Sequence, residues 1–271
     1  MGTGMNSSGR EISDALASAE RRFAAANPLS RARNERACAV LPGGHSRQTL
    51  DYAPFPLTIE RGRGARITDI DGHDYLNLVG DYAAGVFGAT CEPIRLAVEA
   101  VLGAGLSLSG PNTHEVELAE LISQRIPSMQ QVRFCNSGSE ACLFAAQLAR
   151  HATQRSTLMV FNGCYHGGFM IYKAKDPPLS VPFPVVKSTF NDIEGTRAAL
   201  RTAGPTLAAV FVEPMMGSGG CIPAAPDFLA MLREETQRIG ALLVFDEVMT
   251  SRLAPAAPCR RAAHSTIMSS P

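Results

Sequence analysis

The sequence predicts an α/β fold in which a mostly parallel sheet is covered by helices on both faces. Three short runs, 157–161, 207–212 and 241–245, are almost wholly apolar, as in strands buried on both sides. Between them lie two segments with helical periodicity, 193–203 and 226–239. Strands that alternate with helices of ten or more residues imply right-handed crossovers, and therefore parallel neighbours in one sheet.

The N-terminal part has a different pattern. Residues 11–40 predict a helix, because apolar side chains recur at helical spacing, and the run 41–44, Leu-Pro-Gly-Gly, ends it. Residues 57–79 alternate in polarity as in a hairpin, with one turn at its glycines and a second at Asp71-Gly72.

The central part predicts two further helices and a strand. Residues 114–125 form an amphipathic helix with Leu118, Leu121 and Ile122 on one face and a cap at Asn112-Thr113. A short strand follows at 131–135, and a helix at 140–151. Residues 254–271 have no period and are rich in Ala, Pro, Ser and Arg, so we expect a segment that does not continue the sheet. It is either a disordered tail or, as we favour, an altered end of the kind that a frameshift produces when it interrupts a fold.

Composition excludes several classes of function. Of the 271 residues, 25 are Lys or Arg and 25 are Asp or Glu, so no net field favours nucleic acid or an anionic membrane. No apolar run is long enough for a transmembrane helix, and the polar first ten residues do not look like a signal peptide. Seven scattered cysteines without a C-x-x-C pair argue against a disulfide framework or a metal site. We therefore expect a cytoplasmic protein without a bound metal.

Residues 134–141, Phe-Cys-Asn-Ser-Gly-Ser-Glu-Ala, join a predicted strand to a predicted helix. Small residues let the backbone approach a ligand closely, and the free N–H groups of a helix start bind phosphate well. The same residues are also good helix caps, so both interpretations stay open for this segment alone.

Two more loops begin where predicted strands end. Residues 162–168 place Tyr165 and His166 between glycines, which can present a flat face to a planar ligand, or simply form a Gly-rich loop around a packed tyrosine. Residues 212–220 place Glu213 directly after a strand, where a ligand crevice or a solvated surface would both accept it.

The strongest signal is Asp246 at the end of the apolar run 241–245. A carboxylate at the end of a buried strand needs a partner, and a protonated pyridine nitrogen is one that would hold it ionised. A helix cap and an Mg²⁺ ligand are the alternatives, but the chain has no phosphate-binding G-x-x-x-x-G-K-[ST] loop.

Taken in order, these motifs resemble the class III aminotransferases, which use pyridoxal phosphate (PLP), and within them the glutamate-1-semialdehyde aminomutase-like branch. The resemblance runs from about residue 41 to 253 and implies the PLP-dependent transferase fold of type I. It is carried by LPGGHSR, ITDIDGHDYLNL, FCNSGSEA, YHG, VEPMMGSGG and LLVFDEV.

The resemblance also implies roles for residues at the strand ends. Gly138 and Ser139 would hold the cofactor phosphate at a helix start, and Tyr165 would stack on the pyridine ring with His166 beside it. Asp246 would pair with the ring nitrogen.

Three further roles are implied by the same resemblance. Val248 would cover the opposite face of the ring, and Glu213 would lie near the oxygen side of the cofactor. Arg47 lies in a segment similar to the substrate-carboxylate region of relatives that act on β-amino acids, where it could clamp a carboxylate, or simply face solvent after a turn.

The family also needs a Schiff-base lysine on a strand after the aspartate. The only lysines here are Lys173, Lys175 and Lys187, all before Asp246. We therefore expect an N-terminal segment at 1–56, a partial PLP-binding domain at 57–253, and no small C-terminal domain.

The resemblance implies an enzyme that transfers an amino group between an amino acid and a keto acid or aldehyde, in a homodimer. An aminomutase, and a non-catalytic PLP-binding or dimerising remnant, are the alternatives. Without the lysine, we expect this chain to be impaired in catalysis.

Overall fold

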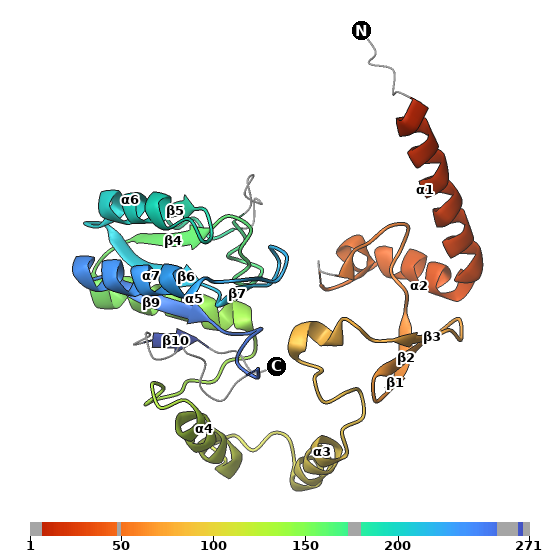
Figure 1. Ribbon diagram of the computed structural model, residues 1–271. Helices are drawn as coiled ribbons and strands as arrows, with labels where there is room; N and C mark the ends of the chain where they lie inside the picture. The colour runs from red at the N-terminus through yellow and green to blue at the C-terminus, as the bar shows by residue number, and fades with distance from the viewer. Residues whose placement is uncertain (1–6, 48–49, 173–179, 254–264, 268–271) are drawn as a thin grey trace. The chain divides into compact units, whose positions relative to one another are not determined.

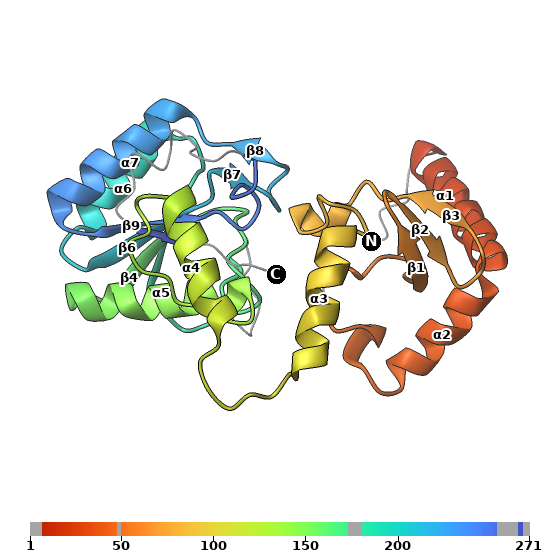
Figure 2. The ribbon, with the colours of Figure 1, turned by 90° about the horizontal axis from the view of Figure 1, so that it is seen from below.

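The computed structural model describes residues 7–47, 50–172, 180–253 and 265–267 (Figures 1 and 2). The chain divides into two compact units, Met1–Leu106 and Ser107–Pro271. The predicted boundary between residues 56 and 57 is not where these units divide, because the hairpin groups with the N-terminal helices. Each unit is described by itself.

The N-terminal unit begins with two helices rather than the single helix predicted over 11–40. Helix α1 spans Ser7–Ala26 and α2 spans Pro28–Cys38. Pro28 interrupts the helix for two reasons. Its ring clashes with a helical conformation of the residue before it, and it has no backbone N–H to donate. The start of α2 is capped from the hairpin, since the backbone N–H groups of Leu29 and Ser30 donate to the Asp71 carboxylate at 2.7 and 2.9 Å.

The predicted hairpin is present as a three-stranded antiparallel sheet, β1 (Ile59–Arg63), β2 (Arg66–Asp69) and β3 (Asp74–Leu76). Buried Asp69 accepts hydrogen bonds from the Tyr75 hydroxyl and the His73 backbone, which fixes the second turn. This pairing raises the pKa of Tyr75 to about 12, through burial first and then through the Asp69 hydrogen bond. Short 3₁₀ turns at Pro42–Gly44 (η1) and Gly80–Ala83 (η3) and the helix α3 (Glu92–Ala104) complete the unit.

The second unit contains a five-stranded sheet in the order β10-β9-β6-β4-β5, in which every pair of neighbours is parallel. The predicted α/β class is therefore confirmed. Three strands lie where the sequence predicted them, whereas β5 was not predicted. The strands are β4 (Thr157–Phe161), β5 (Val185–Ser188), β6 (Leu207–Val212), β9 (Leu242–Asp246) and β10 (Ser265–Ile267), with a small separate ribbon of β7 (Met215–Met216) and β8 (Ile222–Pro223).

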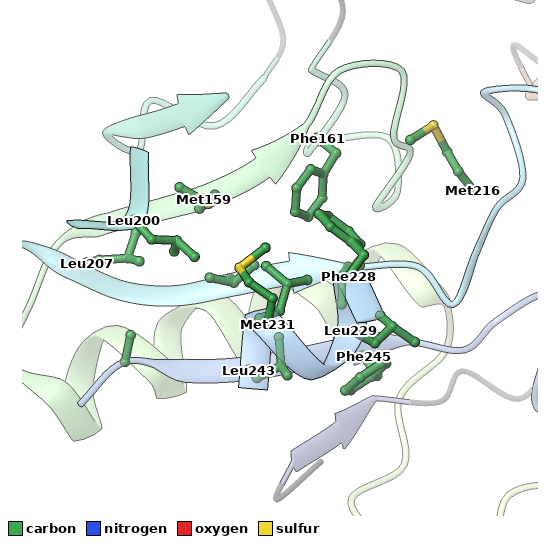
Figure 3. Close-up of a cluster of buried hydrophobic side chains, with 14 residues drawn as sticks. Met159, Phe161, Leu200, Leu207, Met216, Phe228, Leu229, Met231, Leu243 and Phe245 are labelled. Carbon is green, nitrogen blue, oxygen red and sulfur yellow. The ribbon is translucent and has the colours of Figure 1, made fainter. Parts of the chain in front are cut away.

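Helices cover both faces of this sheet (Figure 2). On one face, α6 (Ile193–Ala203) and α7 (Pro226–Ile239) pack over side chains of β4, β6 and β9, and Figure 3 shows this cluster around Phe161 and Phe228. On the other face, small residues of α5 (Gly138–Thr153) lie against Leu158 and Val160. Burying one large apolar side chain contributes about 1.5–3 kcal/mol, so these two clusters hold the sheet and its strand ends in place.

Two segments differ from the sequence prediction. Residues 131–135, expected to form a strand, pair with none of the described strands, and an extended segment without a neighbour has no ladder of hydrogen bonds. Conversely, Ser265–Ile267 adds a strand at the edge of β9, although the tail was expected to leave the sheet. The rest of that tail, 254–264 and 268–271, lies outside the described residues.

The described helices also include α4 (Thr113–Arg125), whose predicted cap is confirmed by the Glu115 backbone N–H, which donates to Asn112 at 3.1 Å. Within the described residues, no helix is both long enough and apolar enough to cross a membrane. The six described cysteines form no disulfide with one another, and Cys259 lies outside the described part of the chain.

Candidate functional site

The candidate site lies at the carboxyl edge of the parallel sheet. Strands β4, β6 and β9 run in the same direction, so the residues that follow them meet at one edge. The structure brings together there the Tyr165-His166 loop, Glu213 and Asp246. All three were predicted separately from strand ends, and their contacts show that they form one group of side chains.

The centre of this group is a buried pair between His166 and Asp246. His166 Nδ1 lies 2.9 Å from Asp246 Oδ2, and both side chains are almost fully excluded from solvent. Burial alone would lower the pKa of His166, but the neighbouring Cys164 and the hydrogen bonds to Asp246 and Cys142 raise it well above its ordinary value. The hydrogen bond to Asp246 therefore favours the protonated form of this buried histidine.

Cys142 is a third member of this group, and the sequence analysis missed it. Its thiol donates to Asp246 Oδ2 at 3.6 Å, and burial raises the pKa of the thiol to about 11. Ligand atoms of Cys142, His166 and Asp246 all lie within 4.8 Å of one another, which resembles a metal-ligand set. However, the imidazole and the carboxylate already bond to each other, so the structure favours a hydrogen-bonded network over a cation site.

The start of α5 presents the predicted phosphate-binding residues. The Ser137 hydroxyl accepts the Glu140 backbone N–H, while the Glu140 carboxylate accepts the Asn136 backbone N–H at 2.7 Å, a reciprocal capping box. This cap leaves the N–H groups at Gly138 and Ser139 in the first turn, where a helix attracts anions.

A glycine loop lies directly against this helix start. The Gly168 backbone N–H donates to the Ser139 hydroxyl oxygen at 2.9 Å. A Cβ atom at Gly167 would come within 2.4 Å of that oxygen, and Gly167 has a φ of 93°, so only glycine fits. The loop after β4 and the start of α5 are therefore held in contact.

Glu213 fastens two loops to the end of β6. Its carboxylate accepts the backbone N–H of Tyr165 at 3.3 Å and that of Gly217 at 3.1 Å. Burial raises the pKa of Glu213, which is opposed by the positive charge on His166 and by these hydrogen bonds. The structure thus shows Glu213 as a positioning group for the tyrosine loop.

Tyr165 and Val248 are close in the sequence to the buried pair, since Tyr165 directly precedes His166 and Val248 is two residues after Asp246. Tyr165 keeps 40% of its surface exposed, although its neighbour His166 is buried, so its ring is accessible to a ligand. Val248 lies in the turn after β9, and its backbone N–H donates to Asp246 Oδ1 at 3.2 Å. Both oxygens of Asp246 are therefore oriented, and Oδ1, which accepts one hydrogen bond, retains a further lone pair.

Arg47 belongs to the N-terminal unit, where its guanidinium lies 3.8 Å from the carboxylate of Asp81, and both side chains are exposed. The residues at the sheet edge belong to the second unit, so Arg47 is described apart from them. Among the lysines, Lys187 lies on β5, and Lys173 and Lys175 lie outside the described residues.

These residues fit an elongated ligand that is anionic at one end and cationic at the other. Ser139 and Cys142 are one turn apart on α5, and Cys142 contacts Asp246, so the helix start and the aspartate lie close together. Among the described residues, the buried His166 Nε2 has no hydrogen-bond partner, so a ligand could bond to it in the same group of polar side chains. PLP, with a phosphate and a protonatable ring nitrogen, has the matching charges.

Comparison with known proteins gives the family. Residues 48–252 match the model of the aminotransferase class III family. The chain belongs to the class III aminotransferases. This confirms the resemblance at the level of the family, and the family's cofactor is the predicted one, PLP.

Two curated relatives show where the chain lies within the family. It is 50% identical over 244 residues to a β-phenylalanine transaminase of Variovorax paradoxus, covering 90% of this chain and 56% of the relative. It is 39% identical over 228 residues to a glutamate-1-semialdehyde 2,1-aminomutase of Brevibacillus brevis, covering 78% and 53%. The chain therefore spans little more than half the length of these relatives.

Solved structures confirm the predicted fold. The crystal structure of the β-phenylalanine aminotransferase from Variovorax paradoxus matches with a TM-score of 0.89 and 48% identity, over 93% of this chain and 58% of that one. A transaminase with PLP bound matches with a TM-score of 0.82 and 31% identity, over 90% and 61%.

Proposed function

We propose that the carboxyl-edge site is the PLP cradle of an enzyme that transfers an amino group between an amino acid and a keto acid or aldehyde. The observation that carries this proposal is the buried His166–Asp246 pair, at 2.9 Å, next to the first turns of α5. A buried carboxylate oriented by a histidine suits a cationic ring nitrogen. A helix start a turn away suits a phosphate.

Each residue of the cradle has a distinct task. Asp246 would accept a hydrogen bond from the protonated ring nitrogen, and His166 holds the aspartate carboxylate in its orientation. Gly138 and Ser139 would donate to phosphate oxygens, and Tyr165 would offer its exposed ring as a stacking surface. When bound, PLP supplies an electron sink that stabilises negative charge on the carbon beside the amino group.

Val248 and Glu213 would act around this core. Val248 would close the face of the ring opposite Tyr165, which excludes water from the reacting centre. Glu213 would hold the Tyr165 loop in place through its two backbone hydrogen bonds.

We further propose that the 271 residues by themselves are impaired in catalysis. Covalent attachment of the cofactor as a Schiff base needs an amine, and in this family the same lysine is expected to move the proton at the substrate carbon. No lysine follows Asp246 in the sequence, and Lys187 lies within β5. The cradle can hold PLP through the ring nitrogen and phosphate alone, so binding and catalysis are expected to separate in this chain.

For the substrate, we propose a β-amino acid with an aromatic side chain. The relative with 50% identity is a β-phenylalanine transaminase, and Arg47 lies in a segment predicted to bind the substrate carboxylate. The likeness to an aminomutase at 39% identity keeps an intramolecular amino transfer as the second candidate. A homodimer and a cytoplasmic location complete the proposal. Exposed leucines on α3 and α4 and cysteines without C-x-x-C spacing support them.

The test is a PLP titration of the 271-residue chain, followed by visible absorbance after removal of free cofactor. We expect wild-type protein and an Asp14→Asn control, changed at an exposed position of α1, to retain PLP equally. Asp246→Asn should bind about tenfold more weakly, since one charge-assisted hydrogen bond is worth about 1.5–3 kcal/mol. Equal retention by all three proteins would contradict the assignment of the cradle.

A second arm separates binding from catalysis. Borohydride fixes PLP that is covalently attached to an amine. We expect PLP retained by the 271-residue chain to be released on denaturation after borohydride treatment. A stable adduct whose mass maps to a lysine peptide would overturn the proposal that this chain is impaired.

A further inference from the structure

A second polar hollow lies at the opposite edge of the sheet. Its volume is about 530 Å³, and its walls come from the end of α5 and from the residues that precede β4 and β6. Those residues lie at the amino ends of parallel strands, so the hollow is separate from the PLP cradle at the carboxyl ends. Its polar lining consists of Arg150, His151, Gln154, Arg155, Ser156 and Thr206.

The lining is rich in hydrogen-bond donors and basic groups. Three of the side chains, Arg150, His151 and Arg155, are basic, and none of the lining residues is acidic. Within the described part of the chain, no carboxylate forms an ion pair with these three side chains. A cluster of like charges without a counter-charge gains stability when an anion binds to it.

Arg150 has unused capacity to donate. Its guanidinium carbon lies 4.5 Å from the centre of the Phe183 ring, and this stacking fixes the plane of the group. Its Nε atom is buried and has no hydrogen-bond partner among the residues that the structure describes. A guanidinium whose plane is already fixed loses little freedom when its outer N–H groups donate to a ligand in the hollow.

Arg155 is fixed by the backbone. Its Nη1 atom donates to the carbonyl oxygens of Leu207 at 3.1 Å and Ile239 at 2.8 Å. These two bonds join the start of β6 to the end of α7 and hold the guanidinium at the edge of the hollow. A fixed arginine beside a stacked arginine is a preorganised pair for the oxygens of a phosphate.

Favourable interaction of basic side chains with the C-terminal end of the α5 dipole explains only part of this arrangement. Arg150 and His151 lie in the last turn of α5, where cations are favourable. Arg155 follows the helix, however, and its carbonyl contacts are to other strands and helices. Because all three basic groups line one hollow, they indicate a ligand-binding site in addition to the stabilisation of a helix end.

We propose that this hollow binds a small phosphate-bearing molecule with two or more negative charges. Two planar guanidinium groups match phosphate oxygens, and the Ser156 and Thr206 hydroxyls and the Gln154 amide would contact neighbouring polar atoms. A volume of about 530 Å³ leaves room for an organic group beside the phosphate. The site is independent of the PLP cradle and of the proposed aminotransferase function.

The experiment is a calorimetric titration of the 271-residue chain with inorganic pyrophosphate at constant ionic strength. Arg150→Gln should bind about tenfold more weakly than wild type, the effect of one charge-assisted contact. Arg133→Gln is the matched control, because Arg133 also stacks on a phenylalanine, Phe144, at 5.0 Å, but lies outside the hollow. It should bind like wild type. If Arg150→Gln does not fold, His151→Gln, changed at an exposed side chain, should weaken binding instead.

Two results would overturn the proposal. One is the absence of binding heat at a pyrophosphate concentration well above that of the protein. The other is binding that falls in Ser139→Ala but not in Arg150→Gln, because that result would place the anion at the start of α5. Neither result depends on PLP, so failure here and failure of the proposed function can be told apart.

Discussion

Helices α7 and α4 have similar lengths, and both carry apolar side chains at helical spacing, yet the structure uses them differently. On α7, Phe228 and Leu232 are fully buried in the cluster between helix and sheet. On α4, Leu118 and Leu121 are 43% and 61% exposed. Both helices were predicted from the same kind of pattern, and only α7 has its apolar face covered by described residues.

The difference shows that periodicity identifies an interface but not its partner. The strands β6 and β9 and the neighbouring α6 surround α7 (Figures 1 and 2). Beside α4 lies an open groove of about 710 Å³, bounded on its other side by residues 130–134, which lie mostly in the segment that was expected to be a strand. The packed sheet around α7 and the open face of α4 should therefore respond differently to the same kind of substitution.

The largest difference in the free energy of unfolding is expected when an apolar side chain is shortened to alanine. Phe228→Ala should lower the free energy of unfolding by about 3–5 kcal/mol, because it leaves a cavity among packed rings. Leu121→Ala on α4 should cost less than about 0.5 kcal/mol, as an exposed substitution does. Urea denaturation of both variants measures the contrast. Equal losses would mean that α4 is packed against a partner in solution.

Removal of a buried charge should have the next largest effect on the free energy of unfolding. Glu235 on α7 accepts from Arg197, Arg201 and Arg238, and these contacts outweigh its burial and lower its pKa to about 2. Glu235→Gln should cost about 2–4 kcal/mol near neutral pH, less than for a fully buried pair because the arginines reach solvent. Glu117→Gln on α4, where Glu117 pairs only with exposed His114, should change little.

The pH dependence of the Glu235 effect follows from the direction of the shift. A carboxyl group with a lowered pKa stabilises the fold above its unfolded pKa of about 4.5, and that contribution is lost as the pH falls towards 2. The difference in the free energy of unfolding between wild type and Glu235→Gln should therefore become smaller as the pH falls from about 4.5 to 2. A gap that widens on acidification would contradict the ion-pair assignment.

His166 allows a similar test at the carboxyl edge of the sheet. His166→Asn should cost about 1.5–3 kcal/mol at pH 6, where a hydrogen bond to a charged group is lost. Because the pKa of His166 is raised, its contribution is complete below about 6.5 and declines as the pH rises through the raised value. His114→Asn, at an exposed position of α4, should show no such dependence in denaturation curves taken at several pH values.

The smallest contrast concerns helix caps. Ser137→Ala removes the cap of α5 and should cost about 1 kcal/mol, because α5 packs on the sheet. Asn112→Ala removes the equivalent bond at α4 and should cost less, since fraying of a helix with an exposed apolar face loses few contacts. Thermal unfolding of the two variants ranks the effects. A larger loss for Asn112→Ala would reverse the comparison.

Much of the sheet was predictable, because strands β4, β6 and β9 are buried on both faces and are almost continuously apolar. The parts that were missed depend on local chemistry or on distant partners. Pro28 divides the first helix, and β5 was obscured by the prolines that precede it. Residues 131–135 have strand-like side chains, but pairing needs a neighbour that the segment cannot specify.

The site was predictable residue by residue but not as a network. Strand ends identified Tyr165, Glu213 and Asp246. The sequence analysis did not indicate that Cys142 contacts Asp246, since 104 residues separate them and cysteine is common in cores. Nor did it show that Glu213 is occupied by two backbone N–H groups, because that depends on how the loops fold.

The central claim is that Asp246 holds the ring nitrogen of PLP, and nuclear magnetic resonance of ¹⁵N-labelled PLP bound to the chain tests it most directly. We predict the chemical shift of a protonated pyridine nitrogen in wild-type protein, and that of a neutral nitrogen in Asp246→Asn. A neutral ring nitrogen in the wild-type complex would contradict the account, because the buried His166–Asp246 pair would then serve some other purpose.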